Sequence, residues 1–444
     1  MYGLKRCFRA LFALGVPLAS QPALAGYPFQ YENLTGEVNL TVGGASIATR
    51  GVNYGTGRVD VRSGENDGSK IGWQEFYVKP GVTLNYSLSD TVRLLAGGSV
   101  VAATTFGDGD AGGFTRSSDG RVAPEELYAG VQAGDWTLTF GRQNYLIGTG
   151  FIVMDGNLDL LGDGAYWLGP RTAFRDSAIL AWNPGPIQAQ AFTLRTDDHY
   201  GDFRLSGVNL DYDLDGQVTL GAMAMTVDTL ASRSSTAVRR DGMQVYNLRA
   251  LRGHLPGVPN LTLNGEYAVQ RGGDGPLTYD ANAWYAQADY QFQDLPLTPT
   301  LGYRYAVFSG DDNPTDNRQK AWDPLSKGFT DWSNWLVGDV VGNYLLFNSN
   351  ERVQQFSIKN RLTDTFTLGA IHYQFWLDEK NFRGAAVSDR RFADETVVYL
   401  DWTPNKHFYS SLSYNWVQAK SAAKQAFGDN DRFSALELYF TYRY

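Results

Sequence analysis

Cysteine is nearly absent from this chain of 444 residues, which contains only Cys7. Cys7 lies in an N-terminal segment that carries the three parts of a secretory signal. These parts are the basic residues Lys5, Arg6 and Arg9, the mostly apolar stretch 10–19, and the cleavage site Ala23-Leu24-Ala25. We therefore predict that residues 1–25 are a cleaved signal peptide. A mature chain without cysteine has no disulfides, thiolate metal sites or cysteine nucleophiles.

Long apolar runs and an excess of positive charge are also missing. Beyond the signal, no stretch reaches the roughly 18 apolar residues that a transmembrane helix requires. The net charge is −9, and it becomes −12 once the three basic residues of the signal are removed. A chain this acidic is a poor partner for nucleic acid, so we exclude nucleic-acid binding.

The usual signs of catalysis are absent as well. The four histidines are scattered without the spacing of metal ligands, at His199, His254, His372 and His407. No nucleophile motif accompanies them. We therefore expect no enzymatic activity, no cofactor and no metal-dependent chemistry.

Alternation of apolar and polar residues is the strongest feature that is present. From Leu436 to Tyr444 the even positions are apolar or aromatic, whereas the odd positions carry Glu437, Thr441 and Arg443 among others. Successive side chains of a strand point to opposite faces, so this stretch has one apolar and one polar face. A strand of this kind that ends on an aromatic residue resembles the assembly signal of outer-membrane β-barrel proteins. A soluble sandwich could also end on such a strand.

The spacing of turns decides between these two folds. About eighteen strands are joined by about eight short turns that alternate with about nine longer, polar loops, as in outer-membrane barrels. Many strands begin or end on an aromatic residue beside a short turn: Tyr86, Trp136, Trp182, Tyr212, Tyr290, Phe292, Trp402 and Tyr442. A soluble protein would explain the alternation but not this row of aromatics, which predicts a membrane-interface girdle.

We therefore predict an all-β protein that forms a transmembrane antiparallel barrel in the bacterial outer membrane. No linker or shift in composition divides the chain, so residues 26–444 form one barrel domain. Such a barrel implies outer-membrane lipid and the barrel assembly machinery as partners. The strands within 187–227 are weakly patterned, and the strand number could differ by two.

Two loops are longer than the rest, at about 143–172 and 309–349, and loops of this length are usually functional or disordered. Trp and Asn are frequent in the second loop, which argues for packing rather than disorder. In the first, Asp155, Asn157 and Asp159 alternate as oxygen ligands do in calcium loops, but the other ligands of an EF-hand are missing. We favour a solvated or pore-facing loop for this stretch and for Asp311-Asp312-Asn313.

Charged residues fall on or beside the predicted inward faces of the strands. The basic members that we predict to line the pore are Arg93, Arg142, Arg175, Arg249, Arg304, Lys359 and Arg361. Acidic residues face inward too, at Glu37, Glu126, Asp211, Asp213, Glu266, Asp289, Asp401 and Glu437. The alternative is therefore a lumen wall of paired charges without net selectivity. Arg142 ends its strand, so a bulge or entry into the loop is needed to turn it inward.

Several motifs occur in an order and at a spacing that resemble the alginate export family of bacterial outer-membrane β-barrel proteins. They are Phe140-Gly141-Arg142-Gln143, Asp155-Gly156-Asn157-Leu158-Asp159, Gly169-Pro170-Arg171-Thr172-Ala173-Phe174, Tyr303-Arg304-Tyr305, Ser309-Gly310-Asp311-Asp312, Asp323-Pro324-Leu325 and Asn348-Ser349-Asn350. The similarity runs from about residue 125 to the C-terminus. It implies an eighteen-stranded barrel with a basic, loop-constricted lumen that passes an anionic polysaccharide.

The sequence thus predicts an outer-membrane channel for an anionic polysaccharide such as alginate, or for a related anionic solute, by passive diffusion. Asp155, Asp159 and Arg171 belong to the predicted constriction loop. We expect Arg142, Arg175 and Arg304 to meet near the constriction. The alternative function is a substrate-specific or general diffusion porin for small-molecule uptake.

Overall fold

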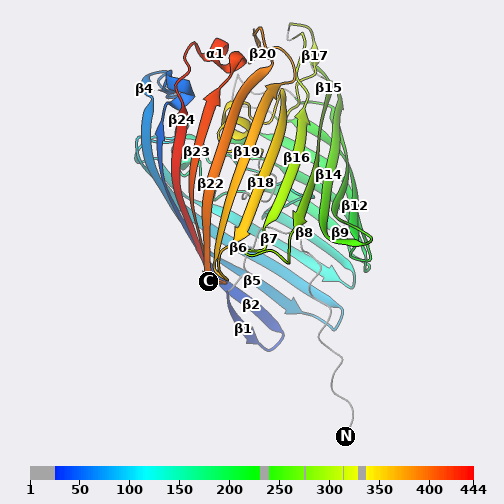
Figure 1. Cartoon of the computed structure of the whole chain (residues 1–444). Coiled ribbons are helices and arrows are strands. Elements are labelled where there is room, and N and C mark those ends of the chain that lie inside the picture. Colours follow the sequence, from blue (N-terminus) through cyan, green and yellow to red (C-terminus); the bar gives the residue numbers. More distant parts are fainter. Residues whose placement is uncertain (1–25, 231–239, 275–276, 314, 329–336) are drawn as a thin grey trace.

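The computed structural model describes residues 26–230, 240–274, 277–313, 315–328 and 337–444. Eighteen long strands, each antiparallel to its neighbours, form one closed sheet (Figure 1). They are β2 (Leu34–Arg50), β5 (Lys70–Ser87), β6 (Val92–Gly107), β7 (Gly120–Ala133), β8 (Trp136–Gln143), β9 (Phe174–Trp182), β10 (Ile187–Arg195), β11 (Phe203–Leu214), β12 (Val218–Thr229), β13 (Met243–Leu255), β14 (Val258–Gly272), β15 (Thr278–Gln291), β16 (Thr300–Phe308), β18 (Glu351–Arg361), β19 (Phe366–Leu377), β22 (Arg391–Asn405), β23 (Phe408–Ala419) and β24 (Phe433–Arg443). The predicted fold and strand number are confirmed. The predicted signal, residues 1–25, lies outside the described residues.

Each strand pairs with the next in the sequence, and β24 closes the ring by pairing with β2. Thr41 lies opposite Arg443, and beyond the ladder Leu40 and Tyr444 exchange two backbone hydrogen bonds of 2.7 and 2.9 Å. Closure satisfies the backbone donors and acceptors of both terminal strands, which a bilayer requires. A short strand, β1 (Tyr27–Tyr31), pairs with the start of β2 and adds a hairpin beside the ring.

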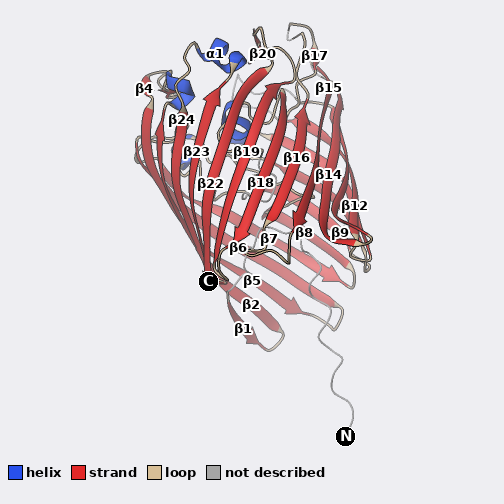
Figure 2. Cartoon of the chain, viewed as in Figure 1, coloured by secondary structure: helices blue, strands red, loops and turns tan. Residues whose placement is uncertain are grey.

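The two ends of the barrel differ as the sequence predicted. Eight short connections lie at the end that holds the C-terminus, and the longer loops lie at the other end. Figure 2 shows the short helical segments, including α1 (Ser421–Phe427), at this loop end. Among the described residues, no helix has the length and apolar character to cross a bilayer. By the usual asymmetry of such barrels, the short turns are periplasmic.

The outer wall is apolar and the inner wall is polar. On β24, Leu436 and Leu438 are exposed on the outside, whereas Glu437 is 4% exposed and faces the lumen. Six of the predicted girdle aromatics are exposed on the outer wall beside the short turns: Tyr86, Trp136, Tyr212, Tyr290, Trp402 and Tyr442. The predicted alternation and girdle are therefore present in the fold.

The closing strand offers a test of the fold. We expect deletion of Tyr442 to Tyr444 to block assembly, because it removes part of the pairing of β24 with both β2 and β23. Unpaired backbone groups cost several kcal/mol each in a bilayer. Folding is measured as faster gel migration before boiling than after. Deletion of Tyr27 to Tyr31 is the matched control, since β1 lies outside the ring, and it should keep the shift. A terminal deletion that migrates like the wild type would contradict the closure.

Candidate functional site

The loop between β8 and β9, residues 144–173, folds into the barrel along the wall formed by β5 and β7. The Glu75 carboxylate on β5 is 2% exposed and accepts the backbone N–H groups of Trp167 at 3.2 Å and Leu168 at 2.8 Å. Lys79, also on β5, donates to the carbonyl of Pro170 at 3.0 Å. Because the alternation directs these wall residues inward, the loop that they hold must lie within the lumen.

The same loop reaches a second part of the wall. Thr149 donates its hydroxyl to Glu266 on β14 at 2.7 Å. Phe151 is 1% exposed and packs edge-on against Tyr285 of β15, with ring centroids 5.5 Å apart. Contacts with β5 and with β14 and β15, far apart around the ring, indicate that the loop extends across the lumen.

In the loop between β16 and β18, the described residues 309–313, 315–328 and 337–350 fold inward as well. The Glu395 carboxylate on β22 accepts the backbone N–H groups of Asp339 at 2.7 Å and Val341 at 2.8 Å. Val341 begins a helical turn, η4 (Val341–Leu345), and Asp339 lies just before it, so a wall carboxylate sits at the positive end of this turn. Tyr344 of this turn donates to Asp110 of the β6–β7 loop at 2.9 Å.

The two long loops interlock inside the barrel. Val153 and Ser326 form an isolated parallel bridge, and Met154 donates its N–H to the Ser326 carbonyl at 2.7 Å. Phe151 stacks on Trp322 at a centroid distance of 6.2 Å. A Cβ at Gly328 would collide with the sulfur of Met154, so the Met154 side chain packs directly against the backbone of the second loop. The β8–β9 and β16–β18 loops therefore pack together as one unit inside the barrel, which we call the plug.

A buried ion pair fixes the shape of the first loop. The side chains of Arg171 and Asp159 are 2% and 0% exposed, and Arg171 Nε lies 2.7 Å from Asp159 Oδ1. The backbone N–H of Arg171 adds a second hydrogen bond to the same carboxylate. Asn157 Oδ1 accepts the N–H of Asp159, so the alternating oxygens hold the loop itself. The interpretation of Asp155 to Asp159 as a solvated or pore-facing loop is wrong for Asp159, because the ion pair buries it.

This ion pair should control the loop. We expect Arg171→Ala to raise single-channel conductance and current noise, because it leaves the Asp159 carboxylate buried and unpaired. Breaking a buried pair in this way costs about 3–5 kcal/mol. Arg318→Ala is the matched control, since Arg318 is 55% exposed beside Asp280 and such pairs contribute little. Recordings in planar bilayers compare the two variants, and identical traces would contradict a structural role for Arg171.

Asp163 ties the first loop to neighbouring elements. Its carboxylate lies 3.0 Å from Arg121 on β7 and 3.2 Å from His199 in the β10–β11 loop. Burial would raise the pKa of Asp163, but hydrogen bonds from His199 and Arg121 hold it at about 2. This anchor therefore keeps its negative charge across the physiological pH range.

A lysine lies buried in the second loop, close to where the loops interlock. Lys327 is 2% exposed and donates to Asn348 Oδ1 at 2.9 Å, and its ammonium lies 4.5 Å from the centroid of the Phe347 ring. Burial lowers the pKa of Lys327 well below its usual range, while the charges of Glu351 and Asp155 oppose that shift. The charge of Asp155 is therefore felt by Lys327 in the interior of the plug.

Two of the predicted pore arginines belong to a hydrogen-bonded group on the inner wall, which we call the wall cluster. It comprises Asn209 and Asp211 on β11, Asn247 and Arg249 on β13, Glu266 on β14, Tyr285 and Gln287 on β15, and Arg304 on β16. Arg249 lies 2.6 Å from Asp211, and Arg304 donates twice to Gln287 Oε1, at 2.8 and 2.6 Å. Positive and negative groups alternate along this part of the wall.

Two other predicted arginines lie at the loop end of the wall, in what we call the rim cluster. It contains Arg142, Arg175 and Arg195 with Asp176, Asp197, Asp198 and Asp202. Arg142 lies 3.6 Å from Asp197 and opposite Leu127, which is 68% exposed on the outer wall. A register irregularity lies between Gly141 and Gln143, but directly opposed residues share a face, so the pairing with Leu127 does not itself turn Arg142 inward. The structure thus groups Arg142 with Arg175, whereas Arg304 belongs to the wall cluster, and the role of all three in the pore stays a prediction.

The remaining basic residues lie near the short turns, on the inward-facing rows. Arg93 follows the β5–β6 turn, and Lys359 and Arg361 precede the β18–β19 turn. All three are exposed, and Arg361 pairs with Asp364 at 2.7 Å. Within the described part of the chain, Arg93 and Lys359 form no ion pair. At the periplasmic end of the lumen these two positive charges are therefore not held in ion pairs, although inward-facing acids such as Asp289 and Asp401 lie near the same turns.

Sequence reasoning missed the acids that hold the loops: Glu75, Glu125 and Glu395 are not among the residues predicted to face the lumen. Glu125 on β7 accepts the N–H groups of Thr172 and Ala173. Alternation could have placed Glu395 inward, because Val398 and Leu400 on the same strand face outward. The partners of these acids lie tens of residues away, so their function was not visible.

An antiparallel barrel with an apolar outer wall, a polar inner wall and loops folded into its lumen defines an outer-membrane channel. The chain matches the alginate export family over residues 116–403, and it belongs to that family. Residues of the family motifs make contacts within and between the loops. Asp323 forms an ion pair with Arg240, and Asn348 accepts a hydrogen bond from Lys327. No curated protein matches the chain.

Solved bacterial structures share the fold. OccAB2 of Acinetobacter baumannii has a TM-score of 0.59 at 13% identity, with 92% of this chain and 98% of that chain covered. OpdL of Pseudomonas aeruginosa has a TM-score of 0.58 and OccK5 (OpdH) of the same species 0.56, each at 12% identity with the same coverage. Identities this low establish the architecture alone. The fold and the family place the protein in the outer membrane.

Proposed function

We propose that the protein passes an anionic polysaccharide such as alginate, or a related anionic solute, through the lumen by passive diffusion and without catalysis. The observation that carries this proposal is that Arg93 and Lys359, at the periplasmic end, form no ion pair with the described residues. The chain as a whole is acidic, so a preference for anions must come from such local charges. In a narrow passage with low-dielectric walls they act more strongly than on an open surface.

The proposed path begins at the periplasmic end of the lumen, beside Arg93 and Lys359, and continues past the plug. The interlocked loops narrow the passage, and the wall cluster, whose Arg249 and Arg304 are 4% and 3% exposed, places alternating charges in the wall behind it. Alternation suits transport, because a polyanion must be attracted without being held tightly. Acidic residues near Arg249 and Arg304 weaken the binding of these arginines to a carboxylate of the transported anion.

A second candidate is the uptake of small anions through a substrate-specific or general porin. The observation that favours it is the plug itself, whose contacts with β5 and β14 leave less room for a polymer than for a small solute. Family membership favours the polymer. The two candidates differ in the length of the anion that passes, not in its charge.

Oligouronates of increasing length test the proposal. We expect them to block the ion current from the periplasmic side, and to do so more strongly as they lengthen, because each added carboxylate can reach another basic group. Neutral oligosaccharides of equal length are the control. Blocking by monomers alone would favour the small-anion porin. Equal blocking by neutral and anionic oligomers would contradict both candidates.

A further inference from the structure

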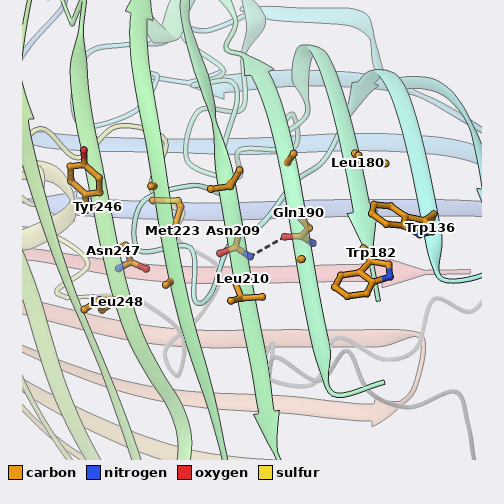
Figure 3. A pocket seen from close by; sticks show the side chains of 15 residues that line it. Trp136, Leu180, Trp182, Gln190, Asn209, Leu210, Met223, Tyr246, Asn247 and Leu248 are labelled. Atoms are coloured by element: carbon orange, nitrogen blue, oxygen red, sulfur yellow. Dashed lines mark hydrogen bonds between the residues drawn. The ribbon is translucent and has the colours of Figure 1, made fainter. Parts of the chain in front are cut away.

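A groove of about 700 Å³ lies on the outer wall of the barrel, over strands β8 to β13. In Figure 3, Trp136 and Trp182 lie together on one side, Tyr246 and Leu248 on the other, and Leu210 between them. Val208 is 57% exposed and Leu248 64%, so these side chains face the membrane. The side chains that open the groove face the membrane, although Asn209 and Asn247, whose side chains belong to the wall cluster, also line it.

The register of the strands explains its shape. Across one level of the sheet the outward residues are Trp182, Ala189, Leu210, Ala222 and Leu248. Two residues further along each strand they are Leu180, Ala191, Val208, Ala224 and Tyr246. Small and large side chains alternate, so two alanine channels run on either side of a ridge on β11. Neighbouring strands are about 4.8 Å apart, which places the channels roughly 10 Å from each other.

The outer wall changes character towards the loop end. The next outward level consists of Thr193, Ser206, Thr226 and Gln244, the first two of which are hydrogen-bonded at 3.1 Å. The level beyond it carries Arg195 and Arg204 with Asp176 and Asp228. Arg204 is exposed, and in the part of the chain that the structure describes it forms no ion pair. The surface thus proceeds from apolar channels through hydroxyl and amide groups to a charged row.

We propose that this surface binds a phosphorylated, acylated glycolipid of the outer leaflet, that is, the lipid A part of lipopolysaccharide. Acyl chains would lie in the two alanine channels, and sugar hydroxyls would meet the Thr193 to Gln244 level. A phosphate would pair with Arg204, whose guanidinium can bind two phosphate oxygens. The order of the three layers follows the order of the three parts of this lipid, and the loop end of the barrel faces the leaflet that contains it.

The order of layers also separates this occupant from others. A phospholipid of the periplasmic leaflet would place its head group at the short turns beside Trp136 and Trp182, away from the hydroxyl level and Arg204. Lipid A satisfies the apolar, hydroxyl and cationic levels together.

Native mass spectrometry of the mature protein in mild detergent, with added lipid A or phosphatidylethanolamine, tests the proposal. We expect wild-type protein to retain lipid A in preference to phosphatidylethanolamine. Arg204→Glu should reduce that retention by about tenfold, and Ala191→Leu with Ala224→Leu should do the same by filling the channels. Each variant is first checked for the gel shift of a folded barrel.

The controls are placed elsewhere on the outer wall. Arg352→Glu changes an exposed arginine on β18, and Ala286→Leu fills an outward position on β15, and neither should change lipid A retention. Equal retention in all variants would overturn the proposal, as would equal retention of phosphatidylethanolamine. A dimer mass in place of bound lipid would also overturn it and assign the groove to a second copy.

Discussion

Removing both long loops should raise single-channel conductance at least about twofold, because an eighteen-stranded barrel without a plug leaves a wide aqueous channel. The variant for this experiment has short Gly-Ser linkers in place of residues 146–168 and 312–346, and it keeps all eighteen strands. Cells that produce it should become sensitive to large antibiotics. Conductance is measured in planar bilayers and permeability by antibiotic susceptibility.

Single-loop variants are informative because the loops interlock. Removing only the first loop takes away the partner of Ser326 and exposes Trp322, which is 1% exposed in the intact protein. Burying such a side chain contributes about 1.5–3 kcal/mol, so the remaining loop should become mobile and the current noisy. Unchanged conductance in the double variant, with the gel shift of a folded barrel retained, would show that the loops do not restrict flow.

Charge reversal at the arginines should have the second large effect. Replacing Arg142, Arg175 and Arg304 together with glutamate changes the local charge by six units, and we expect it to reverse the preference for chloride over potassium. Arg142 and Arg175 act at the rim, and Arg304 acts from the wall cluster. Reversal potentials in a salt gradient measure the preference.

The triple glutamine variant is the matched control for this experiment. It removes the three positive charges without adding negative ones, and it should give a weaker preference rather than a reversed one. If selectivity survives both triple variants, the cations at the periplasmic end, Arg93 and Lys359, set it alone. Replacing these two with glutamine would then be expected to abolish it.

The barrel itself could be predicted because its signals are local. Alternation within each strand, as from Leu436 to Tyr444, depends only on neighbouring residues, and so do the eight short turns. The weak pattern in 187–227 has a physical cause in the structure. There the inward residues Phe192, Leu194 and Met223 are buried under the loops, while the outward Ala189 and Ala222 form the groove, so both faces are apolar.

The site could be predicted only in part, because its contacts join distant segments. The sequence indicated that the two long loops fold inward, and the structure agrees. It could not indicate that Glu75 and Glu395 hold their backbones, since an acid on an inward face looks the same whether it meets a loop or water. Asp159 was misjudged for the same reason, because only the folded loop brings Arg171 over it.

Ion selectivity of the wild-type channel tests the account most directly. The purified protein is placed in a planar bilayer between unequal potassium chloride solutions, and the potential at zero current is recorded. Positive charge at Arg93, Lys359 and the arginines of the lumen predicts a potential of the sign that chloride permeation produces, weakening as salt screens the charges. A potential of the opposite sign, showing potassium to be favoured, would contradict an anion-conducting lumen.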